Sequence, residues 1–149
     1  MPRHIYTRAY ASAYFWGDDL DPLKITQSLL LPPDDQHRRG EPRLIRTRSG
    51  KVMHQMTYRA GMWMMSSERL VNSPRLHIHL LWLLDQLEPH RDAIARILAR
   101  DVSAMFTCFS CGSTTQPPAI PRSVRDRAGA LGFTIDVDHV NTSTKTDFG

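Results

Sequence analysis

Asp136, Asp138 and His139 are the titratable side chains of this chain that best suit acid–base chemistry or metal binding. Apolar residues alternate with them from position 133, which predicts a strand. On a strand, the two carboxylates share one face and His139 lies on the other. Paired carboxylates can hold a metal ion or transfer protons. Two aspartates on the outer face of a strand need no such role, and we favour this reading, so no catalytic residue or metal ligand is assigned.

Two histidines and two cysteines have spacings that invite a metal or redox interpretation. His77 and His79 fall on an expected helix, where residues two apart point about 200° apart and cannot share a zinc ion. We expect His79 to bond a backbone group at the sheet edge. Cys108 and Cys111 have the spacing of half a zinc site, but the chain contains no second pair. Cys108 belongs to an apolar run and is expected to be buried, and the role of the pair stays open.

Three aspartates, Asp18, Asp19 and Asp21, form an acidic turn that could in principle bind a divalent cation. Asp21 precedes Pro22, which is the typical order of an N-cap residue and the first residue of a helix. Calcium loops need more ligands and a longer frame. We therefore interpret the acidic turn as a turn and a helix cap.

Positive charge is concentrated in residues 38–59, which carry a charge of +6 in a chain whose net charge is +4. Glu41 is the only acid there; the basic residues are Arg38, Arg39, Arg43, Arg46, Arg48, Lys51 and Arg59. Residues 43–48 and 51–58 read as a hairpin around Ser49-Gly50. Arginines suit carboxylate or phosphate partners, so the binding candidates are Arg43, Arg46, Arg48 and Lys51. The alternative is an edge strand that uses charge to avoid aggregation.

The strand expected at residues 61–66 is apolar on both faces. Trp63 and Met65 share one face with Gly61, and Met62 and Met64 share the other. This pattern predicts either a central strand covered on both sides or a sheet whose second face meets a partner. Trp63 is therefore added to the binding candidates.

The remaining segments predict an α+β fold, a mostly antiparallel sheet with helices packed on one face. Residues 4–16 alternate as a strand, with alanines on one face and Tyr6, Arg8, Tyr10, Ser12, Tyr14 and Trp16 on the other. A helix from Pro22 is expected to end at Pro32-Pro33 and to bury Leu30, and residues 34–42 are expected to be a loop. Ser73 is expected to cap a helix with a leucine stripe, followed beyond Pro89 by a second helical piece. A strand at 102–109, a loop at 110–121, a helix at 122–131 and a last strand follow.

The length of 149 residues with 41% hydrophobic content predicts one domain, residues 1–140, with a polar tail at 141–149. The N-terminus lacks the apolar stretch of a signal peptide. No apolar run approaches the ~20 residues of a membrane span. Two cysteines exclude a disulfide framework. We expect a cytoplasmic protein that does not use a membrane.

Several phrases, taken in order, resemble the bacterial domain-of-unknown-function 4279 family. They are residues 14–22 (YFWGDDLDP), Ile25-Thr26, Arg39-Gly40-Glu41, Gly61-Met62-Trp63, Ser66-Ser67-Glu68, His79-Leu80 through Leu87-Glu88-Pro89, Leu131-Gly132 and residues 136–139 (DVDH). The resemblance spans about residues 8–140. It implies a small single-domain α+β protein and no agreed activity.

The absence of a catalytic constellation, together with the local positive charge, favours a non-enzymatic protein-binding module without a cofactor. We expect an immunity-type or accessory protein whose partner is a toxin or the product of a neighbouring gene, and a monomer or homodimer. The alternatives are a small metal-dependent hydrolase around Asp136 and Asp138, and a nucleic-acid-binding accessory protein. Nucleic acid is not favoured, because no helix-turn-helix, zinc-finger or RNA-binding signature accompanies the charge.

Overall fold

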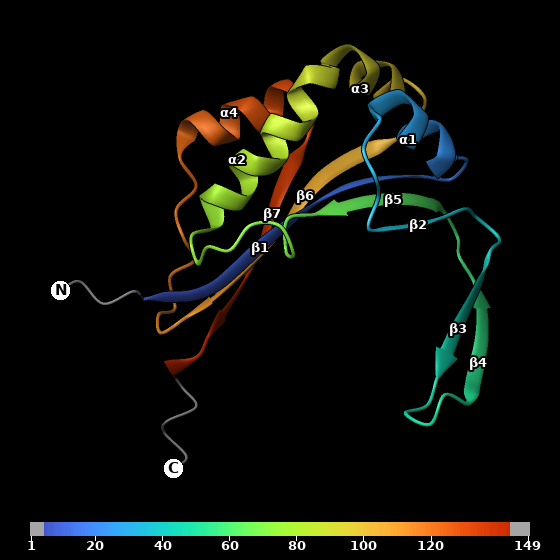
Figure 1. The fold of residues 1–149 in the computed structure, drawn as a ribbon, viewed down its shortest axis with the longest axis horizontal. Coiled ribbons are helices and arrows are strands. Elements are labelled where there is room, and N and C mark those ends of the chain that lie inside the picture. The colour runs from blue at the N-terminus through green and yellow to red at the C-terminus, as the bar shows by residue number, and fades with distance from the viewer. Residues whose placement is uncertain (1–4, 144–149) are drawn as a thin grey trace.

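The computed structural model describes residues 5–143, with the backbone alone described at residues 45 and 52–55. A layer of helices covers one face of a twisted sheet, and a separate hairpin extends away from both (Figure 1). The elements are β1 (Tyr6–Gly17), α1 (Pro22–Leu29), β2 (Asp35–His37), β3 (Pro42–Arg46), β4 (Val52–Thr57), β5 (Gly61–Ser66), α2 (Leu76–Leu87), η1 (Glu88–His90), α3 (Arg91–Leu98), β6 (Ser103–Gly112), α4 (Arg122–Ala130) and β7 (Thr134–Asn141). Within this range, no helix is both long and apolar enough to cross a membrane.

The main sheet has the strand order β2-β5-β1-β6-β7. Neighbouring strands are antiparallel except β6 and β7, which are parallel and are joined through α4. A parallel pair requires such a crossover, because the chain must return to the end of the sheet at which it started. The predicted α+β class, with a mostly antiparallel sheet and helices on one face, is confirmed.

The core lies between the helices and the face of the sheet that carries the alanines of β1. Ala11 and Ala13 are fully buried, and their small side chains let α2 cross close to the strand. The rings of Phe106 and Phe133 stack with centroids 4.4 Å apart, and Phe15 meets Phe133 edge to face. The leucine stripe of α2 fills the rest of this layer with Leu76, Leu80, Leu83, Leu84 and Leu87, each no more than 1% exposed.

Helix α1 begins as predicted and ends earlier than expected. The Asp21 carboxylate accepts a hydrogen bond from the backbone N–H of Leu23 at 3.1 Å, so it is an N-cap. The helix ends at Leu29, because Leu30 adopts a left-handed conformation with φ 55°. This turn directs the Leu30 side chain into solvent, where it is 80% exposed. The expected burial of Leu30 and termination at the proline pair were therefore wrong.

The start of α2 also differs from the prediction. The helix begins at Leu76, and its N-cap position, Arg75, makes no side-chain capping bond. The Ser73 hydroxyl instead accepts from the N–H of Arg75 at 3.1 Å, which closes a local turn before the helix. Ser73 therefore shapes the approach to α2 without capping it.

Two segments expected to be loops contain strand. Residues 35–37 pair with β5 as β2, since the outer edge of β5 would otherwise leave its backbone groups unpaired. β6 continues to Gly112, and the loop that follows is held by bonds from Tyr6 Oη to the Gln116 carbonyl and between His139 Nε2 and the Thr114 carbonyl. The polar tail expected from residue 141 begins with a residue of β7, and positions 144–149 lie outside the described residues.

Candidate binding surface

The face of the main sheet opposite the helices carries a band of aromatic and methionine side chains. Cross-strand partners share a face, and Tyr14 lies opposite Met64 on β5 and Met105 on β6, while Tyr10 lies opposite Phe109. The helices leave this side uncovered (Figure 1). We call this surface the open face; it consists of Tyr10, Tyr14, Trp16, Met62, Met64, Met105 and Phe109, all partly exposed.

The side chains of the open face pack against one another but not against another layer. Tyr10 and Phe109 stack with centroids 5.1 Å apart, and the Arg8 guanidinium lies 5.7 Å from the Tyr10 ring centroid. Partial burial, and secondarily the Asp35 carboxylate, raises the pKa of Tyr14, so its hydroxyl stays protonated at neutral pH. A sheet face in water usually carries polar side chains. An apolar band in this position is typical of an interaction surface.

A hairpin projects beside the open face and forms its own two-stranded sheet. We call residues 42–57 the arm; they comprise β3, β4 and the turn between them. The arm leaves the β2–β5 side of the main sheet and points away from the helices (Figure 1). Its Leu44 and Met56 side chains are 43% and 41% exposed. An isolated two-stranded hairpin is only marginally stable in water. The arm stands apart from the main sheet and the helices, so it lacks the covering layer that such an element needs.

The base of the arm is held by an aromatic stack. His37 of β2 and Tyr58, which follows β4, lie face to face with ring centroids 3.5 Å apart and an interplanar angle of 12°. Arg43 places its guanidinium 6.0 Å from the same tyrosine ring. Backbone bonds from Gly40 N–H to the Tyr58 carbonyl and from Tyr58 N–H to the Glu41 carbonyl close the base. These contacts give the arm a defined exit from the sheet.

The acidic turn holds the segment that leads into the arm. The Arg38 guanidinium donates to Asp21 at 2.9 Å, and the Arg39 guanidinium donates to Asp19 at 2.7 Å. Two of the three carboxylates considered as cation ligands are thus engaged by arginines. The turn therefore links the start of α1 to the approach to the arm.

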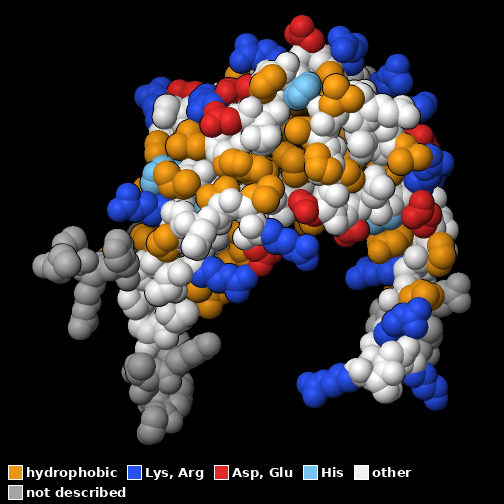
Figure 2. Space-filling view, viewed as in Figure 1, with side chains coloured by type: hydrophobic (Ala, Val, Ile, Leu, Met, Phe, Trp, Pro, Cys, Tyr) orange, Lys and Arg blue, Asp and Glu red, His pale blue; other side chains and the backbone are white. Residues whose placement is uncertain are grey.

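The arm carries positive charge that no described acid neutralises. None of the ion pairs among residues 5–143 involves Arg43, Arg46, Arg48 or Lys51. Arg46 donates to the Gly50 carbonyl at 3.0 Å and so closes the turn. β3 ends at Arg46, which puts Arg48 in the turn and not on the strand where we expected it. Figure 2 shows the Lys and Arg side chains of the arm beside the hollow under the sheet.

Trp63 does not belong to this surface, contrary to the prediction. It lies opposite Phe15, on the helix face of β5, and is fully buried. Its indole Nε1 donates to the Thr26 hydroxyl of α1 at 3.0 Å. The apolar pattern of residues 61–66 was read correctly, but the core lies on the side of Trp63, and the partly exposed side carries Met62 and Met64.

The structure separates the side chains of the candidate acid–base cluster. Asp136 and Asp138 are exposed on one face of β7, at the edge of the sheet. His139 lies on the other face, where Nδ1 is 3.2 Å from Ser110 Oγ and Nε2 is 2.8 Å from the Thr114 carbonyl. The histidine ring thus contacts β6 and the loop that follows it, and not the two carboxylates. Among the side chains that the structure describes, no three of His, Cys, Asp or Glu are grouped closely enough to hold a metal ion.

The remaining candidates are structural or face apart. Cys108 is buried on the helix face of β6, and burial raises the pKa of its thiol to about 12. Cys111 lies three residues further along the strand and therefore on the opposite face, so the two thiols cannot act on one ion. His79 is buried and bonds the Ser73 carbonyl and the Ser67 hydroxyl, which agrees with the backbone bond expected for it.

Sequence reasoning named the arm and missed the centre of the open face. The signal was present in residues 4–16, whose face opposite the alanines is rich in tyrosine and tryptophan. That signal indicates a binding surface only when Met64, Met105 and Phe109 are added to it. These residues come from other strands, and only the strand order places them beside Tyr10 and Tyr14.

A family model described as "Domain of unknown function (DUF4279)" matches residues 7–141. The match covers nearly the whole chain, so the chain belongs to this family, as the resemblance indicated. Searches of curated proteins and of solved structures find no match. The family description names no activity, and the surface just described therefore carries the functional argument.

Proposed function

We propose that this DUF4279 protein is a non-enzymatic binding module that holds an acidic partner protein against its open face and its arm. The observation that carries the proposal is an uncovered aromatic and methionine band beside a hairpin with unpaired positive charge. Tyrosine, tryptophan, methionine and arginine are the residues enriched at the centres of protein interfaces. Methionine side chains also adapt their shape to a partner.

Charge complementarity identifies the chemistry of the partner. Residues 42–59 contain Arg43, Arg46, Arg48, Lys51 and Arg59 and no acidic residue. Arginine guanidinium groups bind carboxylates through paired hydrogen bonds. A partner with an apolar patch, and with aspartate or glutamate only on the side that meets the arm, would therefore cover the open face and neutralise the arm at once. It would also supply the layer that the hairpin lacks.

Carboxylates at the edges of the sheet favour a protein over a nucleic acid. Asp35 lies on β2 at one edge, and Asp136 and Asp138 lie on β7 at the other. Phosphate backbones are bound by continuous positive surfaces, and these carboxylates would repel them on both sides of the apolar band. The proposed partner is a toxin or the product of a neighbouring gene, bound in the cytoplasm. This protein would then act as an immunity-type or accessory protein.

The test is affinity capture from native lysate with matched variants. Arg48→Glu/Lys51→Glu reverses charge on the arm and leaves Arg46, which closes the turn, in place. Met64→Lys puts a charge in the middle of the open face. The control is Arg122→Glu/Arg125→Glu, the same charge change on α4, which lies in the helical layer (Figure 1). The Tm of each variant is measured first, and only variants whose Tm matches that of the natural chain are compared, so that unfolding is not mistaken for lost binding.

The proposal predicts one stoichiometric protein that the natural chain and the α4 control retain and that both surface variants lose. A partner held equally by all four proteins would contradict it, as would the absence of any stoichiometric protein. A captured nucleic acid whose binding falls steeply with salt would overturn the choice of a protein partner.

A further inference from the structure

A pocket between α1 and α3 is separate from the open face and the arm. Its volume is about 510 Å³, within the range of small-molecule sites. Ile25 of α1, Ile97 of α3 and Val102 form part of an apolar lining, and Gln27 and Ser28 add polar groups. This combination of apolar walls and a few polar groups is typical of ligand pockets.

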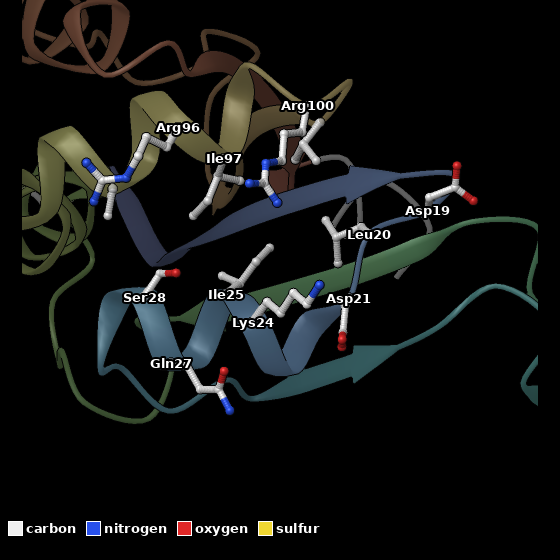
Figure 3. Close-up of a pocket in the computed structure, with 12 residues that line it drawn as sticks. Asp19, Leu20, Asp21, Lys24, Ile25, Gln27, Ser28, Arg96, Ile97 and Arg100 are labelled. Atoms are coloured by element: carbon white, nitrogen blue, oxygen red, sulfur yellow. The ribbon is translucent and has the colours of Figure 1, made fainter.

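Three cationic side chains line this pocket from both helices. Lys24 comes from α1, Arg96 comes from α3, and Arg100 lies in the turn that follows α3. Figure 3 shows the Lys24 ammonium group and the Arg100 guanidinium group extending into the space between the helices. The ion pairs described for residues 5–143 include none of the three. Their charge is therefore available to a ligand.

The acids that share the pocket are already engaged. Asp19 pairs with Arg39 at 2.7 Å, and Asp21 pairs with Arg38 at 2.9 Å while also capping α1. Both partner arginines belong to the segment that leads into the arm and do not line the pocket. These pairs keep the two carboxylates from neutralising the three cations.

Arg100 faces acids on its other side. It also borders a second hollow, which Asp18 and Asp101 line. Lys24 and Arg96 do not line that hollow. Lys24 and Arg96 are therefore the two cations of the pocket that no carboxylate of the second hollow shares.

We propose that this pocket binds a small phosphomonoester with an apolar or ring-shaped body. A phosphomonoester carries a charge of about −1.5 to −2 at neutral pH, which suits three cations better than the single charge of a carboxylate does. Guanidinium groups bind phosphate oxygens through paired hydrogen bonds. The apolar lining would take the body of the ligand. This inference is independent of the protein-binding proposal, since it uses other residues on another face.

The experiment is an NMR titration of the full chain with phenyl phosphate, which has the charge and the ring in one molecule. Three comparison ligands separate the two parts. Inorganic phosphate supplies the head group alone, benzoate supplies a ring with a single negative charge, and benzyl alcohol supplies a neutral ring. The variants are Lys24→Gln, Arg96→Gln and Arg100→Gln. Arg91→Gln is the matched control, because Arg91 is exposed on α3 and does not line the pocket.

The proposal predicts saturable shifts confined to α1, α3 and the residues that join them to the sheet. Each pocket variant should weaken phenyl phosphate by about tenfold, the effect of losing a charge-assisted hydrogen bond, and Arg91→Gln should leave it unchanged. Non-saturable shifts, or equal weakening in Arg91→Gln, would show general attraction to a basic protein and overturn the site. Benzoate binding as tightly as phenyl phosphate would overturn the assignment to phosphate.

Discussion

Replacing Ser67 with alanine is expected to destabilise the protein by about 2–6 kcal/mol, because one buried hydroxyl serves two partners. Ser67 is fully buried and His79 is 1% exposed. The Ser67 oxygen accepts from the N–H of Ala11 at 3.0 Å and lies 2.7 Å from His79 Nδ1. This cluster ties α2 to β1 and to the segment after β5.

The direction of each bond follows from the acceptors. The Ser73 carbonyl, 2.8 Å from His79 Nε2, can only accept, so the proton of the neutral ring is assigned to Nε2. Nδ1 then accepts, and the Ser67 hydroxyl donates to it. The Ala11 carbonyl is satisfied by the backbone N–H of Ser67 at 2.9 Å. Ser67→Ala thus orphans the Ala11 N–H and Nδ1, at about 1–3 kcal/mol each.

A double-mutant cycle with His79→Leu separates these contributions. In His79→Leu the Ser67 hydroxyl can turn to the Ala11 carbonyl, 3.1 Å away, so only the Ser73 carbonyl loses its donor. In the double variant Nδ1 no longer exists, so the combined cost should fall short of the sum by about 1–3 kcal/mol.

Urea unfolding at fixed neutral pH measures the cycle, with the free energy taken from the midpoint and the slope. Ser73→Ala is the control, since it keeps the carbonyl that His79 uses and removes only the local turn bond to Arg75. Additivity within about 0.5 kcal/mol, or a Ser67→Ala cost no larger than that of Ser73→Ala, would refute the proposed bond directions.

Two further outcomes are expected. In the folded protein a thiol reagent at neutral pH should modify Cys111 alone, because burial raises the pKa of Cys108 to about 12 and shields it; two thiols reacting at similar rates would contradict this. Arg127→Gln should cost about 1 kcal/mol at neutral pH, because the hydrogen bond from Arg127 lowers the pKa of Glu88 below 4.5. A carboxyl whose pKa is lowered by folding stabilises the fold at a pH above its unfolded pKa, and this stability is lost as the pH falls through its folded pKa. The free energies of unfolding of the two proteins should therefore converge as the pH falls through the pKa of folded Glu88. A difference in free energy that stays constant with pH would argue against the pair.

Local signals in the sequence predicted most elements because they act within one or two turns of chain. Asp21 before Pro22 marked the start of α1, since capping needs only the next few N–H groups. Gly132, with φ 86°, marked the end of α4. Two of the misreadings, Leu30 and the strand at residues 35–37, involve choices that local propensity does not make: a left-handed C-cap and pairing with a distant edge.

The sequence by itself determined the α+β class, the alanine face of β1, the leucine stripe of α2 and the basic hairpin, because period and local charge are properties of neighbouring residues. Only the tertiary structure decided which face of β5 is core, and so that Trp63 is buried while Met64 is partly exposed. It alone gave His139 its partners, Ser110 and the Thr114 carbonyl, and brought Lys24 to the same pocket as Arg96 and Arg100. Each of these depends on strand order and helix packing, which join residues far apart in the chain.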